Sequence, residues 1–274
     1  MATFFFSGVD KLSLVTILAK LQVCGMFNAG SASEPALQMA LAQYPTLPVA
    51  LDSGSIQGNQ DIHAYSRLIT RMAPRVEWAA NLDVIHNQEL SDHHFQQLQV
   101  LLAGNAQARA KLLWIYQCQS RGASWHPDGD VDRLKRAVDQ HRFIGLGGLR
   151  SVFSRDLLRA QDLLGVIGDI LDAADTQAHI FGLGNRSVLS SCLTQRWFRS
   201  ADSARWLQGL RSRMLLTIDG TAMSGTALTF SGLQCAEQNV RAIQAWMQPK
   251  STQPSSAFHG ASSQTIPVQL QWID

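Results

Sequence analysis

Residues 47–58 of the chain read LPVALDSGSIQG, and the interpretation of the whole sequence starts from this stretch. It begins as an apolar strand and ends in small, polar and glycine residues, with Asp52 at the junction. In α/β enzymes, catalytic groups stand at the carboxyl ends of strands, so this order is typical of an active-site strand. The same order suits an ordinary turn in which Asp52 caps the backbone, and the stretch alone leaves both interpretations open.

The composition indicates a globular protein with a large core. The chain has 274 residues, of which 46% are hydrophobic and 16% are charged. This length fits one α/β barrel of roughly 250 residues. The formal net charge of +2 is too small to indicate a nucleic-acid-binding protein by itself, so an anionic partner would need local clusters of basic residues.

Strand and helix patterns alternate along the sequence. Eight strand candidates lie near residues 3, 24, 48, 82, 113, 143, 180 and 198, with helical segments between them. This alternation implies a parallel sheet with right-handed crossovers, and eight units in this length predict a closed (β/α)8 TIM barrel. An open doubly wound sheet is the alternative. The dinucleotide-binding fingerprint is absent, because Arg150 stands where residues 145–150 would need their last glycine, and no P-loop motif occurs.

The barrel is expected to form a single domain over residues 1–248, followed by a partly flexible tail over residues 249–274 that is rich in Ser, Pro and Gln. The start of the chain lacks the features of a signal peptide, and no apolar run reaches the roughly 18 residues of a membrane span. A cytoplasmic protein without a membrane partner is therefore expected. The four cysteines form no CxxC pair, which predicts free buried thiols, no metal site and no cofactor.

Small or polar groups recur at the ends of the predicted strands. They are Asp52, Asp83, Gln117, Gly147 with Gly148, and Asp202. In a barrel these groups all project at one face. Carboxyl groups that share a site can have different pKa values, so that one handles protons while another stays ionised as a nucleophile. An amide beside a carboxylate suits the Watson–Crick edge of guanine, and glycines let a flat ligand approach backbone N–H groups.

Six segments carry a family resemblance. In order along residues 45–206 they read LDSGSIQ, NLDVI, WIYQ, IGLGGL, HIFGLGN and SADSARW, and together they resemble the tRNA-guanine transglycosylase superfamily. In that family a barrel exchanges guanine for a 7-deazaguanine through a covalent nucleotide–enzyme intermediate. The Asp-Ser-Gly motif and the ADS..W ending look more like the DNA-modifying branch. The implied partners are a nucleic acid, DNA rather than tRNA, and a 7-deazaguanine base such as preQ0, while a need for helper subunits stays open.

The resemblance also implies residue roles. Asp202 would be the nucleophile that attacks the sugar C1′, and Asp52 would be the general acid and base. The implied base-binding residues are Asp83, Gln117, Gly147, Gly148, Phe181 and Ser53. Asp83 and Gln117 would bond the purine edge, the glycines would offer backbone contacts, and Phe181 would stack on the base.

The sequence departs from the tRNA enzymes at two places. Ile56 stands where those enzymes keep an aromatic residue that sandwiches the base. Their zinc ligands, a CxCxxC motif and a histidine, are also missing, since Cys235 stands alone and His259 has no cysteine partner. A barrel without the zinc subdomain is therefore expected.

Arginines cluster in the sequence around Asp202. Arg196, Arg199 and Arg205 are predicted to contact a nucleic-acid backbone, because arginine suits bidentate contacts to phosphate. A solvated basic face would give the same pattern.

Three other functions fit the same residues. A glycosylase would use the same carboxylates but let water resolve the intermediate. A non-catalytic barrel could bind nucleic acid or a partner subunit, although the presence of both Asp52 and Asp202 argues against a decayed site. An enzyme acting on a small phosphorylated metabolite would bind phosphate through the strand-end glycines near residues 147 and 184.

Overall fold

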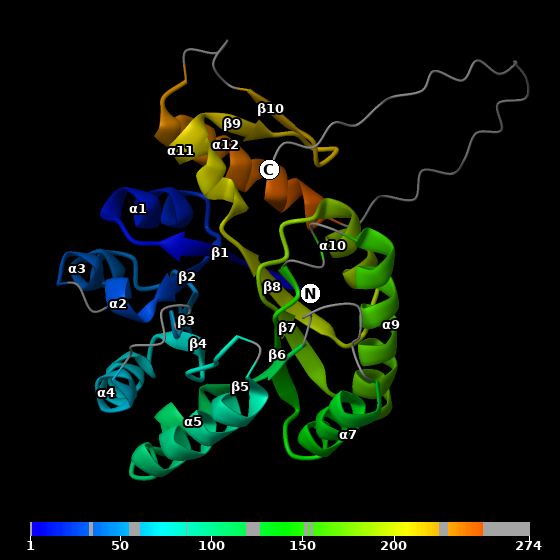
Figure 1. The fold of residues 1–274 in the computed structure, drawn as a ribbon. Coiled ribbons are helices and arrows are strands. Elements are labelled where there is room, and N and C mark those ends of the chain that lie inside the picture. Colours follow the sequence, from blue (N-terminus) through cyan, green and yellow to red (C-terminus); the bar gives the residue numbers. More distant parts are fainter. Residues whose placement is uncertain are drawn as a thin grey trace, which may run out of the picture.

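The computed structural model of the chain describes residues 2–32, 35–54, 61–85, 87–118, 127–150, 153, 156–224 and 230–248. Its centre is a closed barrel of parallel strands in chain order (Figure 1). The strands are β1 (Thr3–Val9), β2 (Cys24–Asn28), β3 (Val49–Asp52), β4 (Val76–Ala80), β5 (Leu112–Gln117), β6 (Phe143–Gly147), β7 (Gln177–Ile180) and β8 (Phe198–Ser203). Because β1 pairs with both β2 and β8, the sheet has no free edge. The predicted TIM barrel is confirmed, and the open doubly wound sheet is excluded.

Helices surround the barrel. They are α1 (Leu12–Lys20), α2 (Ala29–Ala32), α3 (Pro35–Gln43), α4 (Ile62–Met72), α5 (Gln88–Leu101), α6 (Ala106–Ala110), α7 (Pro127–Val138), α9 (Leu157–Ala173) and α10 (Arg186–Cys192). In Figure 1, α1, α3, α4 and α5 cover one side of the barrel, and α7, α9 and α10 cover the other. The strands are thereby buried on both faces, which explains why segments such as LLWIYQ in β5 are almost wholly apolar.

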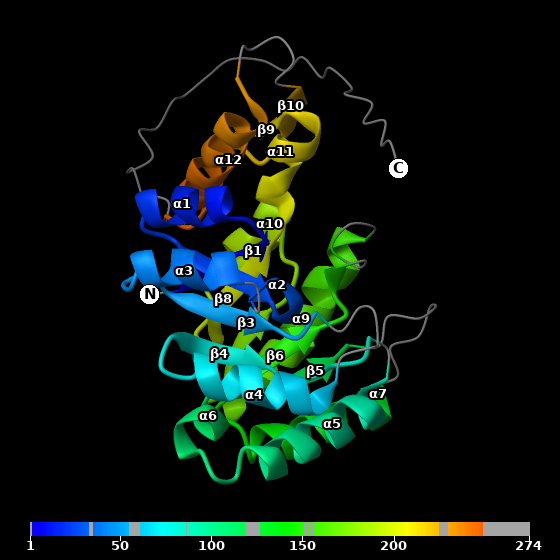
Figure 2. The same ribbon diagram turned by 90° about the vertical axis from the view of Figure 1, so that its left-hand side faces the viewer.

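The chain adds several elements after β8. They are a 3-10 turn (Arg205–Leu207), α11 (Gln208–Ser212), an antiparallel pair made of β9 (Met214–Leu216) and β10 (Ala222–Ser224), and α12 (Gly232–Trp246). Figures 1 and 2 show them gathered at one side of the molecule. Helix α12 contacts both α1 and α10, so it completes the ring of helices. The buried amide of Asn239 fixes this arrangement, since it accepts a hydrogen bond from the Leu216 N–H and donates to the carbonyls of Trp206 and Met214.

Side chains fill the interior of the barrel. Alternate residues of each strand point inward. Those inside the barrel form a hydrophobic cluster of Phe5, Met26, Ala50, Trp78, Ala80, Leu113 and Ile115. The ring of His179, which is fully buried, packs against Trp78 at 4.5 Å between centroids. The interior of the barrel is therefore a packed core.

Two helix starts and one strand end bear on the site. Helix α1 begins after Lys11 without a side-chain cap. Helix α5 begins at Gln88, because the Asn87 side chain caps it by accepting from the Leu90 N–H. Strand β4 ends at Ala80, so Asp83 lies in the loop that follows the strand.

Other expectations concern the ends and the surface of the chain. Within the described ranges, no helix combines the length and apolar character needed to cross a membrane. The cysteines are free as predicted; Cys118, Cys192 and Cys235 are buried, whereas Cys24 is partly exposed. The predicted tail, residues 249–274, and Ile56 lie outside the described residues.

Candidate active site

The carboxyl ends of the strands bring several predicted residues to one face of the barrel. Asp52 is the last residue of β3, Gln117 ends β5, Gly147 ends β6, and Asp202 is the penultimate residue of β8. Strand pairing places Gln117 directly beside Gly147. In a parallel barrel this face is the one where substrates bind.

Asp52 has the most perturbed carboxyl group of the site. Its pKa is raised from 3.8 to about 7; burial is the largest cause, and repulsion from Asp83 and then Asp202 acts in the same direction. Hydrogen bonds from the backbone N–H groups of Gly54 and Ser53 oppose the rise. The three carboxyl groups therefore share one electrostatic environment. At neutral pH, Asp52 exists in both protonation states, which is the property that a general acid and base needs.

Asp202 is held differently. It lies within β8 and is only 3% exposed, so it is a strand residue and not a helix cap. Its Oδ1 accepts a hydrogen bond of 3.0 Å from the Gly182 N–H and lies 3.3 Å from Nε2 of His179. Gly182 has a φ of 71°, a conformation that favours glycine. Among the described residues, no hydrogen bond reaches Oδ2 of Asp202, so this oxygen is the one available for chemistry.

Asp83 and Gln117 form a hydrogen-bonded pair beside these carboxyl groups. Gln117 Nε2 donates to Asp83 Oδ2 at 2.5 Å, and the buried Ser53 hydroxyl donates to Asp83 Oδ1 at 3.0 Å. The backbone N–H of Gln117 donates to the Gln88 side chain at 2.6 Å, which fixes the position of the strand end. In the described part of the chain, the buried Oε1 of Gln117 has no partner. Buried acceptors are rarely left unpaired in proteins, so this oxygen is a candidate contact for a ligand N–H group.

Gly147 and Gly148 keep the space beside Gln117 free of side chains. A Cβ on Gly147 would lie 2.7 Å from Nε2 and 2.9 Å from Oε1 of Gln117. Gly148 has a φ of 76°, and its Cβ would lie 2.5 Å from the carbonyl oxygen of Cys118. A larger residue at either position would have to displace its neighbour.

Phe181 directly follows β7 and is partly exposed. Its ring packs edge-on against His179, with 4.6 Å between centroids, and against Trp78 at 5.8 Å. Phe181 therefore covers the top of the barrel core, and its stacking on a base stays a prediction.

Two of the three predicted backbone-binding arginines lie at the other end of the barrel. Arg196 precedes β8 and pairs with Asp172 at 3.4 Å, close to the point where α9 ends and the chain enters β7. The Arg199 guanidinium lies 4.4 Å from the ring centroid of Phe143, the first residue of β6. Both therefore lie near the amino ends of the strands. They are separated from the carboxylate site, because a strand rises about 3.3 Å per residue, and their contact with a nucleic-acid backbone stays a prediction.

Arg205 follows β8 and lies at the carboxyl end. Its guanidinium donates to the carbonyl of Gly184 at 2.6 Å and to that of Gly220 at 3.5 Å, and burial lowers its pKa. These contacts attach the loop between β9 and β10 to the loop after β7. A contact between Arg205 and a nucleic-acid backbone stays a prediction.

His179 is the site residue that sequence reasoning did not single out. Its Nδ1 lies 2.9 Å from the Ser200 hydroxyl, and its Nε2 faces Asp202. The alternation in the segment AHIF of residues 178–181 could have placed it, since this pattern puts His179 and Phe181 on the inward face of the strand.

Comparisons with known proteins identify no function for the chain. No family model and no curated protein matches the chain. Similar solved structures include a candidate fructose-1,6-biphosphate aldolase from Coccidioides immitis, with 11% identity, a TM-score of 0.49, and coverage of 90% of this chain and 86% of that one. The aldolase QR15 has 10% identity, a TM-score of 0.49, and coverage of 89% and 96%. The tryptophan synthase alpha chain from Legionella pneumophila has 12% identity, a TM-score of 0.49, and coverage of 90% and 91%.

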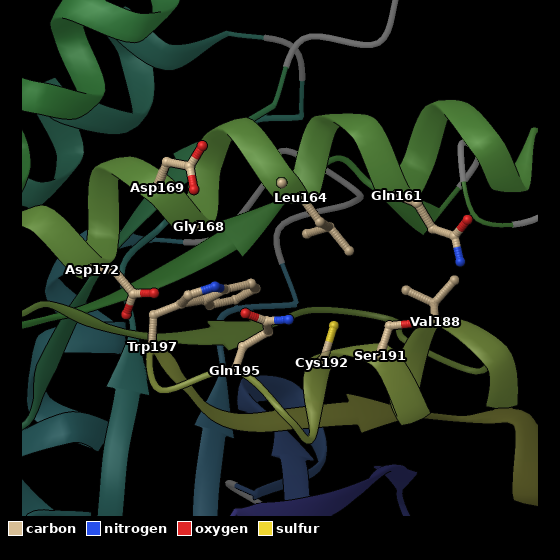
Figure 3. Close-up of a pocket in the computed structure, with 11 residues that line it drawn as sticks. Gln161, Leu164, Gly168, Asp169, Asp172, Val188, Ser191, Cys192, Gln195 and Trp197 are labelled. Carbon is tan, nitrogen blue, oxygen red and sulfur yellow. The ribbon is translucent and has the colours of Figure 1, made fainter.

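A separate pocket of about 370 Å³ lies in the helical layer between α9 and α10 (Figure 3). Gln161, Gly168 and Asp172 of α9 line one side, and Ser191 and Cys192 of α10, with Trp197, line the other. Two acidic side chains, Asp169 and Asp172, line it, and Asp172 is paired with Arg196 near the amino ends of the strands. The pocket is therefore distinct from the carboxylate site.

In the described ranges, no group of three or more His, Cys, Asp or Glu side chains is arranged to hold a metal ion.

Proposed function

We propose that the chain is a base-exchange transglycosylase that replaces guanine in nucleic acid, DNA rather than tRNA, with a 7-deazaguanine. The observation that carries the proposal is the contrast between two carboxyl groups of one site. The pKa of Asp52 is raised to about 7, whereas Asp202 accepts its hydrogen bonds from described residues through Oδ1. Carboxyl groups in such different environments are suited to separate roles in proton transfer and nucleophilic attack. The six sequence segments that resemble the transglycosylase superfamily contain both residues.

The proposed reaction has two displacement steps. Asp202 attacks C1′ with Oδ2, a C–O bond forms, and the C1′–N9 bond breaks with its electron pair on the base. The departing guanine takes the proton of Asp52. The incoming 7-deazaguanine then gives its N9 proton to ionised Asp52 and attacks C1′, and the C–O bond breaks with its electron pair returning to Asp202. At the end of the cycle, Asp52 again carries its proton and Asp202 is again a free carboxylate.

The neighbouring polar groups suit recognition of a purine edge. Guanine presents N–H donors side by side, and both Asp83 and Oε1 of Gln117 are acceptors. The target nucleotide must leave the base stack before Asp202, at the end of the barrel, can attack its C1′. This requires base flipping or a single-stranded substrate. The 7-deaza base is expected to bind between Asp83, Gln117 and Gly148.

The test is exchange of a labelled base. DNA and tRNA that carry radiolabelled guanine are incubated with the full chain, with and without a 7-deazaguanine. Without the second base, the proposal allows release of at most one labelled guanine per enzyme, as the covalent adduct forms. Repeated release from DNA only when the second base is present, with the strand left free of abasic sites, would support exchange. Repeated release without added base, with abasic sites left in the strand, would replace the proposal by a glycosylase. Absence of release from both nucleic acids, together with DNA binding that is insensitive to salt, would contradict the proposal.

A glycine substitution tests the base pocket. Gly147→Ala is expected to weaken binding of a 7-deazaguanine by roughly 10- to 100-fold, because the added methyl group would displace Gln117 and leave polar groups unpaired. Isothermal titration calorimetry measures the affinity. The matched control is Gly165→Ala on α9, where a Cβ would meet no atom within 4 Å. This control should bind normally, and equal affinities of the two variants would exclude a pocket beside Gln117.

A further inference from the structure

We infer that His179 is a positioning residue of the nucleophile: it donates a hydrogen bond from Nε2 to Oδ1 of Asp202, which leaves Oδ2 as the attacking oxygen. The catalytic part of this inference, that Oδ2 is the attacking oxygen, rests on the proposed function. The hydrogen-bond arrangement itself can be measured without a substrate.

The two ring nitrogens of His179 have partners of different kinds. Nε2 lies 3.3 Å from a carboxylate oxygen of Asp202, and an ionised carboxylate only accepts hydrogen bonds. Nε2 must therefore carry the hydrogen. Nδ1 then presents a lone pair to the Ser200 hydroxyl 2.9 Å away, and this hydroxyl donates to it. The three side chains form one directed chain from Ser200 through His179 to Asp202.

Strand register makes this chain possible. The pairing of β7 with β8 shifts between Ala178 and His179, so that His179 aligns with Ser200 and Arg199 is the extra residue. A bulge of this kind changes which side chains face each other across two strands. Without it, the inward-facing residues of β8 would not meet both nitrogens of the imidazole.

The surroundings favour a neutral imidazole. His179 is fully buried, and its ring contacts Trp78 at 4.5 Å, Phe181 at 4.6 Å and Phe5 at 5.9 Å between centroids. Burial lowers its pKa, while Asp202 acts in the opposite direction. A neutral donor orients the carboxylate without cancelling its negative charge. Hydrogen bonds are also stronger in an apolar interior than in water.

The same donor has a role in both displacement steps. His179 and the Gly182 N–H both bond Oδ1, so the carboxylate has one fixed orientation with Oδ2 available. After Oδ2 has bonded to C1′, Oδ1 becomes the carbonyl oxygen of the ester. The two donors then stabilise the negative charge that returns to the carboxylate when the C1′–Oδ2 bond breaks. Loss of the His179 donor should therefore slow resolution of the intermediate.

Two variants separate this role from packing. His179→Phe keeps an aromatic ring but has no donor, and His179→Gln can place an amide N–H near the position of Nε2. The covalent adduct is formed with DNA, a 7-deazaguanine is added, and adduct decay is followed on denaturing gels. We expect decay to slow by roughly 10- to 100-fold in His179→Phe, with His179→Gln much closer to the wild type. Wild-type decay in His179→Phe, or equal slowing in both variants at equal melting temperature, would overturn the inference.

A second measurement needs no substrate. In ¹⁵N-histidine-labelled protein at pH 7, long-range ¹H–¹⁵N spectra should show His179, assigned by its absence from His179→Gln, as the neutral Nε2–H tautomer. Ser200→Ala should shift its Nδ1 resonance. The Nδ1–H tautomer or a doubly protonated ring would refute the hydrogen-bond chain. If the wild type forms no adduct with any nucleic acid, the proposed function fails, and the tautomer then decides the His179–Asp202 hydrogen bond separately.

Discussion

Asp202→Asn is expected to abolish the covalent protein–nucleic acid adduct and to lower base exchange by at least about a thousandfold. An amide is a poor nucleophile toward C1′, so the first displacement step would not occur. The fold should survive, because the asparagine Oδ1 can accept the hydrogen bonds that Asp202 receives from His179 and Gly182. Adduct formation is measured on denaturing gels, and exchange by release of labelled guanine.

The matched control for this variant is Asp172→Asn. Asp172 is also an aspartate that contacts a basic side chain, but it lies on α9 near the amino ends of the strands and its partner is the exposed Arg196. Exposed ion pairs contribute about 0–1 kcal/mol, so this control should keep both its stability and its activity. An adduct that persists in Asp202→Asn would place the nucleophile elsewhere.

Asp52→Asn should lower base exchange by about 10²- to 10⁴-fold, because the variant cannot give a proton to the departing guanine or take one from the incoming base. The adduct itself should still be detectable when a substrate with a good leaving group is used. A wild-type rate of exchange in Asp52→Asn would assign proton transfer to another group.

The same variant changes how stability depends on pH. Asp52 keeps its proton up to about pH 7 in the folded state, whereas the unfolded chain loses it near 3.8. Between these values the folded state binds more protons, so the Asp52 contribution to the free energy of unfolding falls as pH rises. At about 1.4 kcal/mol per pKa unit, the wild type should lose up to about 4 kcal/mol relative to Asp52→Asn between pH 4 and pH 8. Urea unfolding of both proteins at these two pH values measures this difference, and parallel pH profiles would show that Asp52 is not perturbed.

The fold followed from periodic features of the sequence. Alternation of strands and helices predicted the barrel, and apolar strands that end in Asp52, Gln117 or Gly147 predicted which residues share a face. Such inference works because the carboxyl ends of parallel strands meet at one end of a closed barrel.

Contacts between side chains of different strands were harder to predict from the sequence. Proximity in sequence suggested that Arg196 and Arg199 accompany Asp202, but the length of β8 carries them to the other end. The link between His179 and Asp202 depends on a register shift, and strand register is decided by the packing of the whole barrel. The β9–β10 pair depends likewise on tertiary contacts of Asn239, which no local pattern reveals.

The closure of the barrel between β1 and β8 has a consequence for biosynthesis. The aromatic strand Phe4–Phe6 is synthesised before its partner β8 and before the covering α12. The Trp206 indole donates to the carbonyl of Ser7, 199 residues earlier, and Lys20 pairs with Glu237 across the same seam at 2.9 Å. Long-range pairing of this kind closes slowly, and unpaired apolar strand edges promote aggregation in the meantime. A nascent chain that stalls before α12 is therefore expected to need a chaperone to hold its first strand.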